Sequence, residues 1–572
     1  NMLVADNSPA QGAPVVANEG GTLVNLTIDA PAGSSPVVHT ASGQMFNTIA
    51  TQGRLFDASL YSGDDLPLDG NPYNTYLPDE LSYQLKELSM AIDRGDAMPG
   101  IPSAFASYVN LATDRDIMGN ARTFAGAVDY GCFETWNITD GYKATQAPAG
   151  GSVVYLHGGN LLLANLPATF APGYLLLKEG TSLYGNGNTV SLDYVAVERT
   201  FGAGWQLAAF PYALQRDSIS RVRYAGTTYD PEPLSVTAGD TVAVYNGRAR
   251  AESLSRYHEA NSPYWEEKSA LAATEGFGLC LAQAGTYRFT GRATGDVPLY
   301  IENNTDKTVS LVQHNLTEVG SDGTPRFTHK ENMGWNLFGL PYLVSSYGWA
   351  DMDLPHLLYG YDGLTYTTIE SWSGGEARLG GGYFTQTAVI GNGEKEELLF
   401  PQPQSTSLTS VAGTGMDLVL RITGDGGADE ARLRTTDSSC DALSYEVGRD
   451  GVKFMSMNRS VPQIYVTNPS TGTRFSLATA VDETVSAPVG VYVADSGYYT
   501  IDLPDETMAQ GYDVLLLTDT YTGQTTDLKE SPYTFLADGA EDADRRFSLS
   551  FRRKEDGEPT VQVYLHERTL YV

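Results

Sequence analysis

Asp114, Arg115 and Asp116 carry side chains that could do chemistry if the fold brought them together. Two carboxylates about 5 to 9 Å apart can act as acid and base in polysaccharide cleavage, and carboxylates beside a basic Arg can hold calcium. Successive residues on a strand point to opposite faces, however, so adjacency alone does not make a carboxylate pair. Because Gly119 and Asn120 continue the stretch as turn formers, we interpret it as a turn and predict no catalytic residue there.

Two acidic stretches, Asp425 to Glu430 and Asp538 to Asp544, offer the oxygen ligands that calcium prefers. In the second stretch, Asp538, Asp542 and Asp544 are calcium candidates. Neither stretch has the ligand spacing of an EF-hand, so a solvated acidic loop is the competing interpretation. We expect no other metal or cofactor.

Familiar catalytic motifs are missing from the sequence. It contains no G-x-S-x-G, no H-E-x-x-H and no P-loop, and its seven His are dispersed from His39 to His566. The three cysteines, Cys132, Cys280 and Cys440, lie far apart without a C-x-x-C, which supports neither a zinc site nor a dense disulfide framework. At least one thiol must stay free unless it pairs between chains. We therefore predict that the chain is not an enzyme.

Four of the six tryptophans separate into two groups. Trp205 and Trp335 alternate with apolar residues inside expected strands, so we predict that they are buried anchors. Trp349 and Trp372 lie in a Tyr- and Gly-rich region, which makes them the better candidates for stacking on glycan rings.

Composition limits the fold and the partners. The 572 residues include 60 Gly, 35 Tyr and 28 Pro, with 18% charged residues, which predicts a β-rich chain with many turns. A net charge of -33 argues against nucleic acid and anionic membranes as partners. The sequence contains no run of about 18 apolar residues, so we predict no transmembrane segment. The chain begins at Asn1, without Met or a signal-peptide core, so we expect a piece of a larger protein.

The elements that would position these residues differ along the chain. Short apolar pulses from Gly20 to Phe56 predict rungs of a β-solenoid, whose last rung needs a cover. Residues 78–95 place Leu81, Leu85, Leu88 and Ile92 at helical spacing, which predicts a helix packed on the end of the stack. Thr113 to Glu134 would then form a turn and a short strand. We place the domain boundaries at 1–145, 146–405, 406–556 and 557–572.

An internal repeat marks the second of these regions. GWQLAAFPY at 204–212 recurs as GWNLFGLPY at 334–342, an offset of 130 residues (335 minus 205). In each copy Gly starts a strand, Trp and Leu alternate onto a buried face, and Pro ends the ladder. The repeat predicts two related β-sandwich units, or the two sheets of one large sandwich. Short alternating runs after Met416 predict a further sandwich.

Several of these stretches resemble one family of exported proteins. TDRDIMGNARTFAGAVDYGCFE at 113–134 is similar to the closing segment of right-handed parallel β-helices in bacterial surface proteins, D-x-D-G-x-x-R followed by V-D-x-G-A-x-E. Ile117-Met118 and Cys132 depart from that pattern. The GWNL block and its flanks at 275–293 and 379–391 resemble type IX secretion cargo of Bacteroidetes, although Leu340 replaces the usual Asn. Asp450 and Lys453 stand where that family has an Asp followed by a Lys before an apolar strand.

The resemblance implies an all-β chain: the end of a right-handed parallel β-helix, then antiparallel β-sandwich domains. It also implies a non-enzymatic cell-surface protein for adhesion or presentation, handled by the type IX translocon and anchoring machinery and attached to the outer membrane, with glycans or surface proteins as further partners. The alternative is the stem of a carbohydrate-active enzyme or protease whose catalytic domain lies upstream.

The last residues carry the expected secretion signal. Val561, Val563, Leu565 and Leu570 give a new alternating segment after a charged linker, and it resembles the first strands of a type IX C-terminal sorting domain. The resemblance implies that the native gene continues by one small domain. An edge strand completing the preceding sandwich is the competing interpretation.

Overall fold

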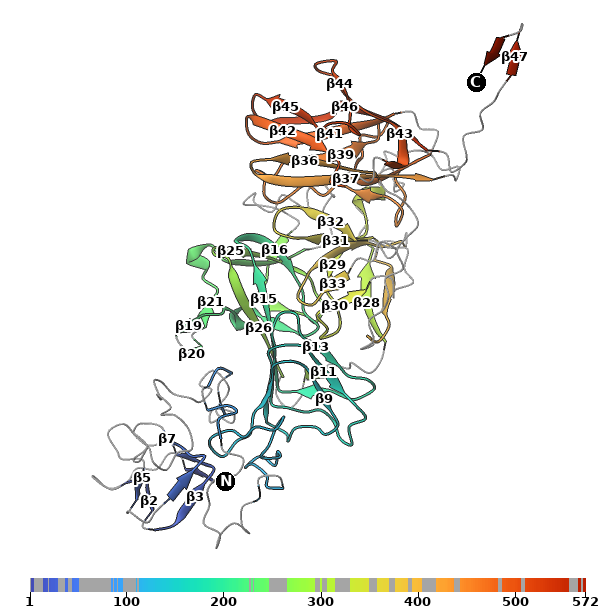
Figure 1. Ribbon diagram of the computed structural model, residues 1–572. Coiled ribbons are helices and arrows are strands. Elements are labelled where there is room, and N and C mark those ends of the chain that lie inside the picture. The colour runs from blue at the N-terminus through green and yellow to red at the C-terminus, as the bar shows by residue number, and fades with distance from the viewer. Residues whose placement is uncertain are drawn as a thin grey trace.

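The structure is a computed structural model, and it confirms the all-β fold class (Figure 1). The described residues are 2–4, 14–18, 20–28, 37–39, 44–50, 84–85, 87–89, 91–95, 110, 113–225, 228–229, 231–245, 265–293, 299–300, 306–313, 330–348, 357–369, 376–388, 393–403, 418–436, 443–481, 486–505, 510–554, 564–566 and 569–571. Within them the helical elements are three-residue 3-10 turns: η3 (Arg216–Ser218), η4 (Val236–Ala238) and η6 (Lys330–Asn332).

The first part of the chain is a parallel β-solenoid. Its opening turns stack strands in three short parallel sheets: β1 (Met2–Val4) with β4 (Leu26–Ile28) and β7 (Ile49–Ala50), β2 (Val16–Asn18) with β5 (Val37–His39), and β3 (Thr22–Val24) with β6 (Gln44–Phe46). The later turns stack β8 (Trp136–Ile138), β10 (Val153–Leu156), β12 (Tyr174–Leu177) and β15 (Tyr194–Phe201) in one sheet, and β9 (Tyr142–Ala144), β11 (Asn160–Leu163) and β13 (Ser182–Tyr184) in another.

The predicted end of the solenoid at residue 145 is therefore wrong. Parallel pairing continues through β10 and β12 to β15. The reason is visible in the apolar runs VVYL and YLLL, whose four residues are all buried. Strands buried on both faces lack the polar alternation of a sandwich strand and are typical of parallel sheets.

The segment predicted as a helix forms turns where the structure describes it, at 84–85, 87–89 and 91–95. It covers a face of the later sheet, and not the end of the stack. Leu85 and Ile92 pack against outward-facing solenoid residues such as Tyr155, whose hydroxyl donates to the Leu85 carbonyl oxygen at 2.7 Å. Gln84 also accepts the Val153 N–H at 3.0 Å. Since the segment obtains its hydrogen bonds from the solenoid, apolar spacing did not require a helix.

The repeat region supplies the cover that the last solenoid turn needs. Strand β26 (Gly285–Arg292) pairs antiparallel along the whole of β15. On the other sheet, the N–H of Leu183 in β13 donates to the Leu343 carbonyl oxygen at 2.7 Å, and Ser182 bonds Ser345. Both sheet edges are thus occupied by residues from beyond the solenoid, which satisfies their exposed backbone groups.

The two GW-x-L repeats open two copies of one unit, and the copies have the same strand order. In the first, a four-stranded sheet runs β16 (Gly204–Ala208), β25 (Phe277–Leu281), β22 (Thr241–Tyr245), β23 (Trp265–Glu267). In the second it runs β29 (Trp335–Phe338), β34 (Tyr383–Gln386), β31 (Leu358–Tyr361), β32 (Tyr366–Ile369). The flanking strand pairs are also equivalent. The pair β17 (Leu214–Gln215) and β24 (Ala270–Leu271) of the first copy corresponds to β30 (Ser346–Gly348) and β33 (Glu376–Arg378) of the second. The pair β15 and β26 corresponds to β28 (Lys307–Val312) and β35 (Lys395–Phe400).

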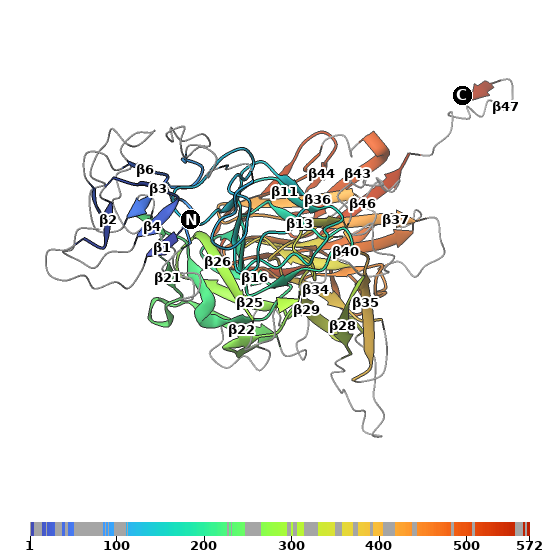
Figure 2. The same ribbon diagram turned by 90° about the horizontal axis from the view of Figure 1, so that it is seen from below.

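Smaller strands complete the first copy: β14 (Ser191–Leu192) pairs with β27 (Leu299–Tyr300), β18 (Ile219–Arg221) with β21 (Glu232–Pro233) and β26, and β19 (Tyr224–Ala225) with β20 (Thr228–Tyr229). Figure 2 shows the green strands of the first copy beside the yellow strands of the second.

Equivalent residues of the repeat have the same conformation and hydrogen bonds in both copies. Gly204 and Gly334 have positive φ of 91° and 72°, a conformation that favours glycine. The hydroxyl of Tyr212 donates to the Phe289 carbonyl oxygen at 2.9 Å, and that of Tyr342 donates to the Phe400 carbonyl oxygen at 2.7 Å. Phe289 lies in β26 and Phe400 in β35, which are equivalent strands. The duplication expected from sequence is therefore present in the fold.

The copies also meet through reciprocal contacts. Gly276, just before β25, donates its N–H to the Leu337 carbonyl oxygen at 3.1 Å, and Gly382, just before β34, donates its N–H to the Leu207 carbonyl oxygen at 3.1 Å. Leu207 and Leu337 are repeat equivalents. An interface in which i contacts j and j contacts i has the pattern of a two-fold dimer, here within one chain. The sequence predicted either two related sandwich units or the two sheets of one large sandwich. Both descriptions fit, since two related units pack against each other through their GW-x-L sheets.

A final sandwich follows the second copy. Its strands form one hydrogen-bonded sheet that encloses a single core. They are β36 (Leu418–Gly424), β37 (Gly427–Thr436), β38 (Gly451–Val452), β39 (Gln463–Thr467), β40 (Arg474–Val481), β41 (Ala487–Val493), β42 (Gly497–Asp502), β43 (Tyr512–Asp519), β44 (Thr525–Asp527), β45 (Tyr533–Ala537) and β46 (Glu541–Arg553). Pairing is antiparallel except between β37 and β40.

The last strands, β47 (Tyr564–His566) and β48 (Thr569–Tyr571), pair with each other as an antiparallel hairpin. In the described residues neither joins the sheet of the sandwich, so the edge-strand alternative does not hold. Leu565 and Leu570 are partners in the hairpin register, whereas Val561 and Val563 lie outside the described residues.

Candidate functional site

The turn that begins at Asp114 is built around Asp116. Its carboxylate accepts the backbone N–H of Met118 at 2.9 Å, of Asn120 at 2.7 Å and of Glu134 at 2.9 Å, and the Asn120 side-chain amide at 2.9 Å. Asp114 accepts the Asn110 N–H at 3.0 Å. Because the lone pairs of Asp116 are committed to its own segment, the structure places it as the organiser of a turn.

A buried charged cluster lies behind this turn. Arg122, Asp129 and Glu134 are at most 1% exposed. The Arg122 guanidinium donates to the Phe133 carbonyl oxygen at 3.1 Å and to the Asp129 carbonyl oxygen at 2.9 Å, and lies 3.8 Å from the Glu134 carboxylate. Asp129 accepts the N–H groups of Asp93 and Thr135. We call Arg122, Asp129 and Glu134 the closing cluster, and its burial leaves no path for a substrate.

The cluster has strongly shifted acids. Burial, reinforced by the nearby Asp129 carboxylate, raises the pKa of Glu134 to about 10. Burial raises the pKa of Asp129 to about 7, against the N–H groups of Asp93 and Thr135 that favour its charged form. Glu134 is therefore held as a neutral acid at neutral pH.

These shifts predict a pH dependence. The unfolded state releases the Glu134 proton above pH 4.5 and the Asp129 proton above pH 3.8, whereas the folded state keeps both protons to higher pH. The free energy of unfolding should therefore fall as the pH rises, up to about pH 10 because of Glu134 and up to about pH 7 because of Asp129. We expect the Glu134→Gln variant, whose amide imitates the neutral acid, to lose part of this decline. Urea unfolding at about pH 5 and about pH 9 measures it, and an unchanged pH slope in the variant would contradict the assignment.

Segment 128–134 lies between the early and the later solenoid turns. Gly131 donates its N–H to the Asn47 carbonyl oxygen at 2.8 Å, and Cys132 donates its N–H to the Thr27 hydroxyl at 3.0 Å. Asn120, in the turn that precedes this segment, donates its side-chain N–H to the Ser152 hydroxyl at 2.8 Å, next to strand β10. The segment that resembles a closing motif therefore joins two parts of the solenoid.

Gly131 provides a test of this junction. Its φ is +94°, and an added Cβ would stand 2.6 Å from the Thr27 hydroxyl oxygen. Gly126 has a φ of +93° with nothing within 4 Å. We expect Gly126→Ala to cost about 1 to 2 kcal/mol of conformational strain and Gly131→Ala to cost more. Equal losses in denaturant unfolding would show that the close contact with Thr27 is unimportant.

A second buried cluster ties the turn segment 84–95 to the first copy. Arg288 in β26 donates to both oxygens of Glu87 at 2.8 and 2.7 Å and to Glu198 in β15. The Tyr224 hydroxyl donates to Glu87 at 2.7 Å. Burial raises the pKa of Glu87, but the Arg288 charge, the hydrogen bonds from Tyr224 and Arg288 and the Lys178 charge together outweigh it, so the pKa of Glu87 lies below its usual value. This bridge is structural, since its groups satisfy one another.

The motif residues of the final sandwich are also buried contacts. Lys453, 2% exposed, pairs with Asp429 at 2.5 Å, and Asp429 accepts the Thr365 hydroxyl from the second copy at 2.6 Å. Asp450 accepts the Thr479 N–H at 3.0 Å. Asp429 thus joins the sandwich to the second copy, whereas Asp450 bonds within the sandwich.

An aromatic core continues that junction. Trp205 and Trp335, 8% and 1% exposed, lie in one hydrophobic cluster, as predicted for buried anchors. The cluster also includes Phe384 of the second copy and Phe454 of the sandwich. The ring of Phe454 lies 4.7 Å from Trp335 and 4.7 Å from Tyr359. We call this cluster the junction core, because it takes residues from both copies and from the sandwich.

A pocket of about 690 Å³ opens beside the junction core, and we call it the junction pocket. Three modules line it: the first copy with Ala203, Gly204 and Trp205, the second with Tyr361 and Gly363, and the sandwich with Met457, Asn458, Arg459 and Ser460. Its size is in the range of small-molecule sites, and module interfaces are where such sites commonly occur. Sequence reasoning missed it because its residues come from three distant segments.

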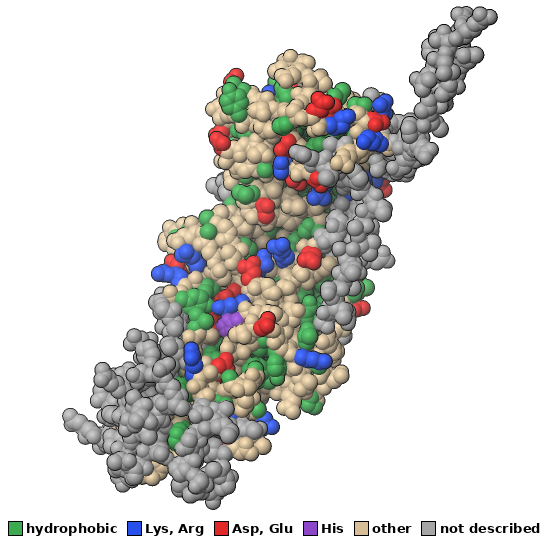
Figure 3. Space-filling view, viewed as in Figure 1, with side chains coloured by type: hydrophobic (Ala, Val, Ile, Leu, Met, Phe, Trp, Pro, Cys, Tyr) green, Lys and Arg blue, Asp and Glu red, His purple; other side chains and the backbone are tan. Residues whose placement is uncertain are grey.

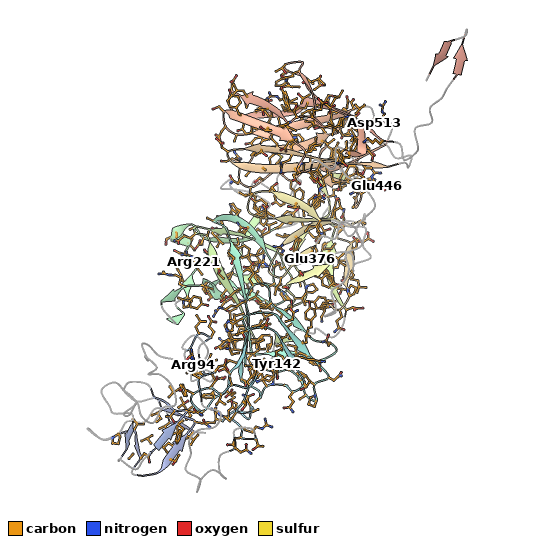
Figure 4. All side chains as sticks on the ribbon, viewed as in Figure 1. Arg94, Tyr142, Arg221, Glu376, Glu446 and Asp513 are labelled. Carbon is orange, nitrogen blue, oxygen red and sulfur yellow. The ribbon has the colours of Figure 1, made fainter. Side chains whose placement is uncertain are left out.

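Charged side chains elsewhere on the surface are mixed in sign. On the face shown in Figure 3, basic and acidic side chains lie interspersed. Figure 4 labels Arg221 of the first copy and Glu376 of the second on the ribbon, with Glu446 and Asp513 on the sandwich.

The remaining residues predicted from the sequence are the two glycan-stacking tryptophans, the calcium candidates and the cysteines. Trp349 and Trp372 lie outside the described residues. Asp542 and Asp544 bind the Arg474 guanidinium at 2.9 and 2.7 Å, and Asp538 is exposed. No three His, Cys, Asp or Glu among the described residues form a group that could hold a metal ion, so the calcium prediction finds no support. Cys132 and Cys280 are free, and Cys440 is not described.

Comparisons add no relative: no protein-family model, curated protein or solved structure matches the chain. In the described part of the structure no helix is long and apolar enough to span a membrane.

Proposed function

We propose that this chain is the non-enzymatic stem of a secreted bacterial surface protein, exported by the type IX system, attached to the outer membrane and used for adhesion or presentation. The translocon and the anchoring machinery are its proposed partners. The resemblance of residues 113–134, the GWNL block and the C-terminal strands to type IX cargo supports the export route.

The observation that carries the proposal is the junction core. Domains in one chain move relative to each other unless their interface is large and hydrophobic. Here Trp205, Trp335 and Phe454 bring three modules into one buried cluster, and β26 of the first copy continues the solenoid sheet. Such continuity is what a stem requires to hold another domain or a ligand site at a fixed place.

The charged clusters support a structural role over catalysis. The closing cluster and the Arg288 bridge use their carboxylates on backbone N–H groups, on a tyrosine hydroxyl and on arginines. Carboxylates that are sealed from solvent in this way stabilise a fold but cannot reach a substrate.

Export can be tested with the native gene and the same gene stopped after Asp556, which leaves β46 intact because that strand ends at Arg553. Intact cells of a type IX-competent strain would be treated with added protease. We expect the native product to be shaved from the surface and the shortened product to stay folded in the periplasm. Shaving of both products to the same extent would contradict the sorting role of the C-terminal strands.

A further inference from the structure

We propose that the junction pocket binds a short acidic saccharide, with the sugar ring against Tyr361 and the carboxylate on Arg459. The assignment goes beyond the stem function and does not depend on the export route. It concerns a different place from the two tryptophans that the sequence favoured for glycans.

The pocket combines an aromatic wall with polar groups. Tyr361 is half-buried, and its hydroxyl is held by donation to the Gly363 carbonyl oxygen at 3.0 Å. Its ring stands 4.7 Å from that of Tyr366, which fixes its orientation. A fixed aromatic ring beside polar side chains is suited to a sugar, since one face of a pyranose is apolar and its rim carries hydroxyls.

Arg459 decides the charge of the ligand. It is exposed at the pocket, and no described carboxylate lies within ion-pair distance of its guanidinium. Its guanidinium is therefore open to a carboxylate that a ligand brings into the pocket. Guanidinium groups bind carboxylates through two parallel hydrogen bonds.

The loop that carries Arg459 is held in place. The Ser456 hydroxyl donates to the Leu364 carbonyl oxygen and accepts the Asn458 N–H at 3.0 Å, and the Asn458 side-chain oxygen accepts the Ser460 N–H at 3.1 Å. The Asn458 amide nitrogen remains as a donor toward a ligand. A preformed loop lowers the entropy cost of binding.

A buried amide without a partner lies next to the pocket. Gln206 is 4% exposed, and its Nε2 atom has no hydrogen-bond partner in the structure. Gln206 is not one of the lining residues of the pocket, because its Nε2 lies behind Gly363, where an added Cβ would stand 2.8 Å from it. The pocket itself offers donors from Arg459 and Asn458, which favours an acceptor-rich, negatively charged sugar.

The experiment titrates the purified full chain with trigalacturonate and 3′-sialyllactose, and with lactose as the neutral probe, by calorimetry or NMR. We expect at least one acidic probe to bind more tightly than lactose. Arg459→Gln should weaken that binding by at least about tenfold, because a charge-assisted hydrogen bond is lost. Arg552→Gln, at an exposed arginine on β46 outside the pocket, is the matched control and should leave binding unchanged.

Three results would overturn the assignment: no binding of either acidic probe, equal binding of lactose, or equal losses in the Arg459→Gln and Arg552→Gln variants. Both replaced arginines are exposed, so both variants are expected to fold, and their thermal unfolding would be compared with the parent chain.

Discussion

Replacing Arg122 with Ala is expected to lower the free energy of unfolding by about 3 to 5 kcal/mol. The change removes donors from two buried carbonyl oxygens, those of Phe133 and Asp129, and leaves a cavity in a site that is 0% exposed. Each unpaired buried acceptor costs about 1 to 3 kcal/mol, and the cavity adds to this loss. The early and later solenoid turns should separate more easily, because segment 128–134 joins them.

Urea unfolding of the full chain measures this loss. Arg94→Ala is the matched control, since Arg94 is exposed and a surface change of this kind usually stays within about 0.5 kcal/mol. A loss for Arg122→Ala as small as that of the control would show that the closing cluster does not hold the solenoid together.

Replacing Trp335 with Ala is the second large change, with an expected cost of about 3 to 5 kcal/mol. Trp335 is 1% exposed, its ring stands 5.1 Å from Tyr359 and 4.7 Å from Phe454, and its indole N–H donates to the Glu331 carbonyl oxygen at 2.9 Å. Truncation removes contacts with two modules at once. If each Trp anchored only its own repeat unit, the loss of stability would be confined to one sandwich unit. Because the junction core takes residues from three modules, we expect the loss to be shared by them.

Thermal and denaturant unfolding of the variant measure the size of this effect. Tyr498→Ala, at an aromatic side chain that is 73% exposed, controls for removing a ring and should change little. A change below about 0.5 kcal/mol at Trp335 would contradict its role as an anchor.

Sequence alone predicted the fold class and the repeat, because both depend on local pattern. Alternating apolar residues bounded by turn residues predict strands without knowledge of tertiary contacts. The repeated Gly-Trp-x-Leu motif corresponds to equivalent backbone conformations, since Gly204 and Gly334 both have positive φ. The turn at Asp116 followed from residue types in the same way. Burial of Trp205 and Trp335 followed from alternation within their strands.

Features set by distant contacts could not be predicted. The solenoid boundary was misplaced because burial of VVYL and YLLL on both faces favours a parallel sheet, but a four-residue apolar run does not identify the strands with which it pairs. Segment 84–95 has helical spacing but bonds to the solenoid through Gln84 and Leu85. The junction pocket depends on contacts between the first copy, the second copy and the sandwich, and no single stretch contains its pattern.

The most direct test of the central claim, that the modules form one continuous stem, is hydrogen exchange measured by mass spectrometry on the parent chain and on Trp335→Ala. Amides of β16 and β25 in the first copy, β29 and β34 in the second, and β39 and β40 in the sandwich report on the three modules separately. We predict that the variant loses protection in all three, because the junction core is shared. Loss confined to β29 and β34, with unchanged protection in the first copy and the sandwich, would contradict the account.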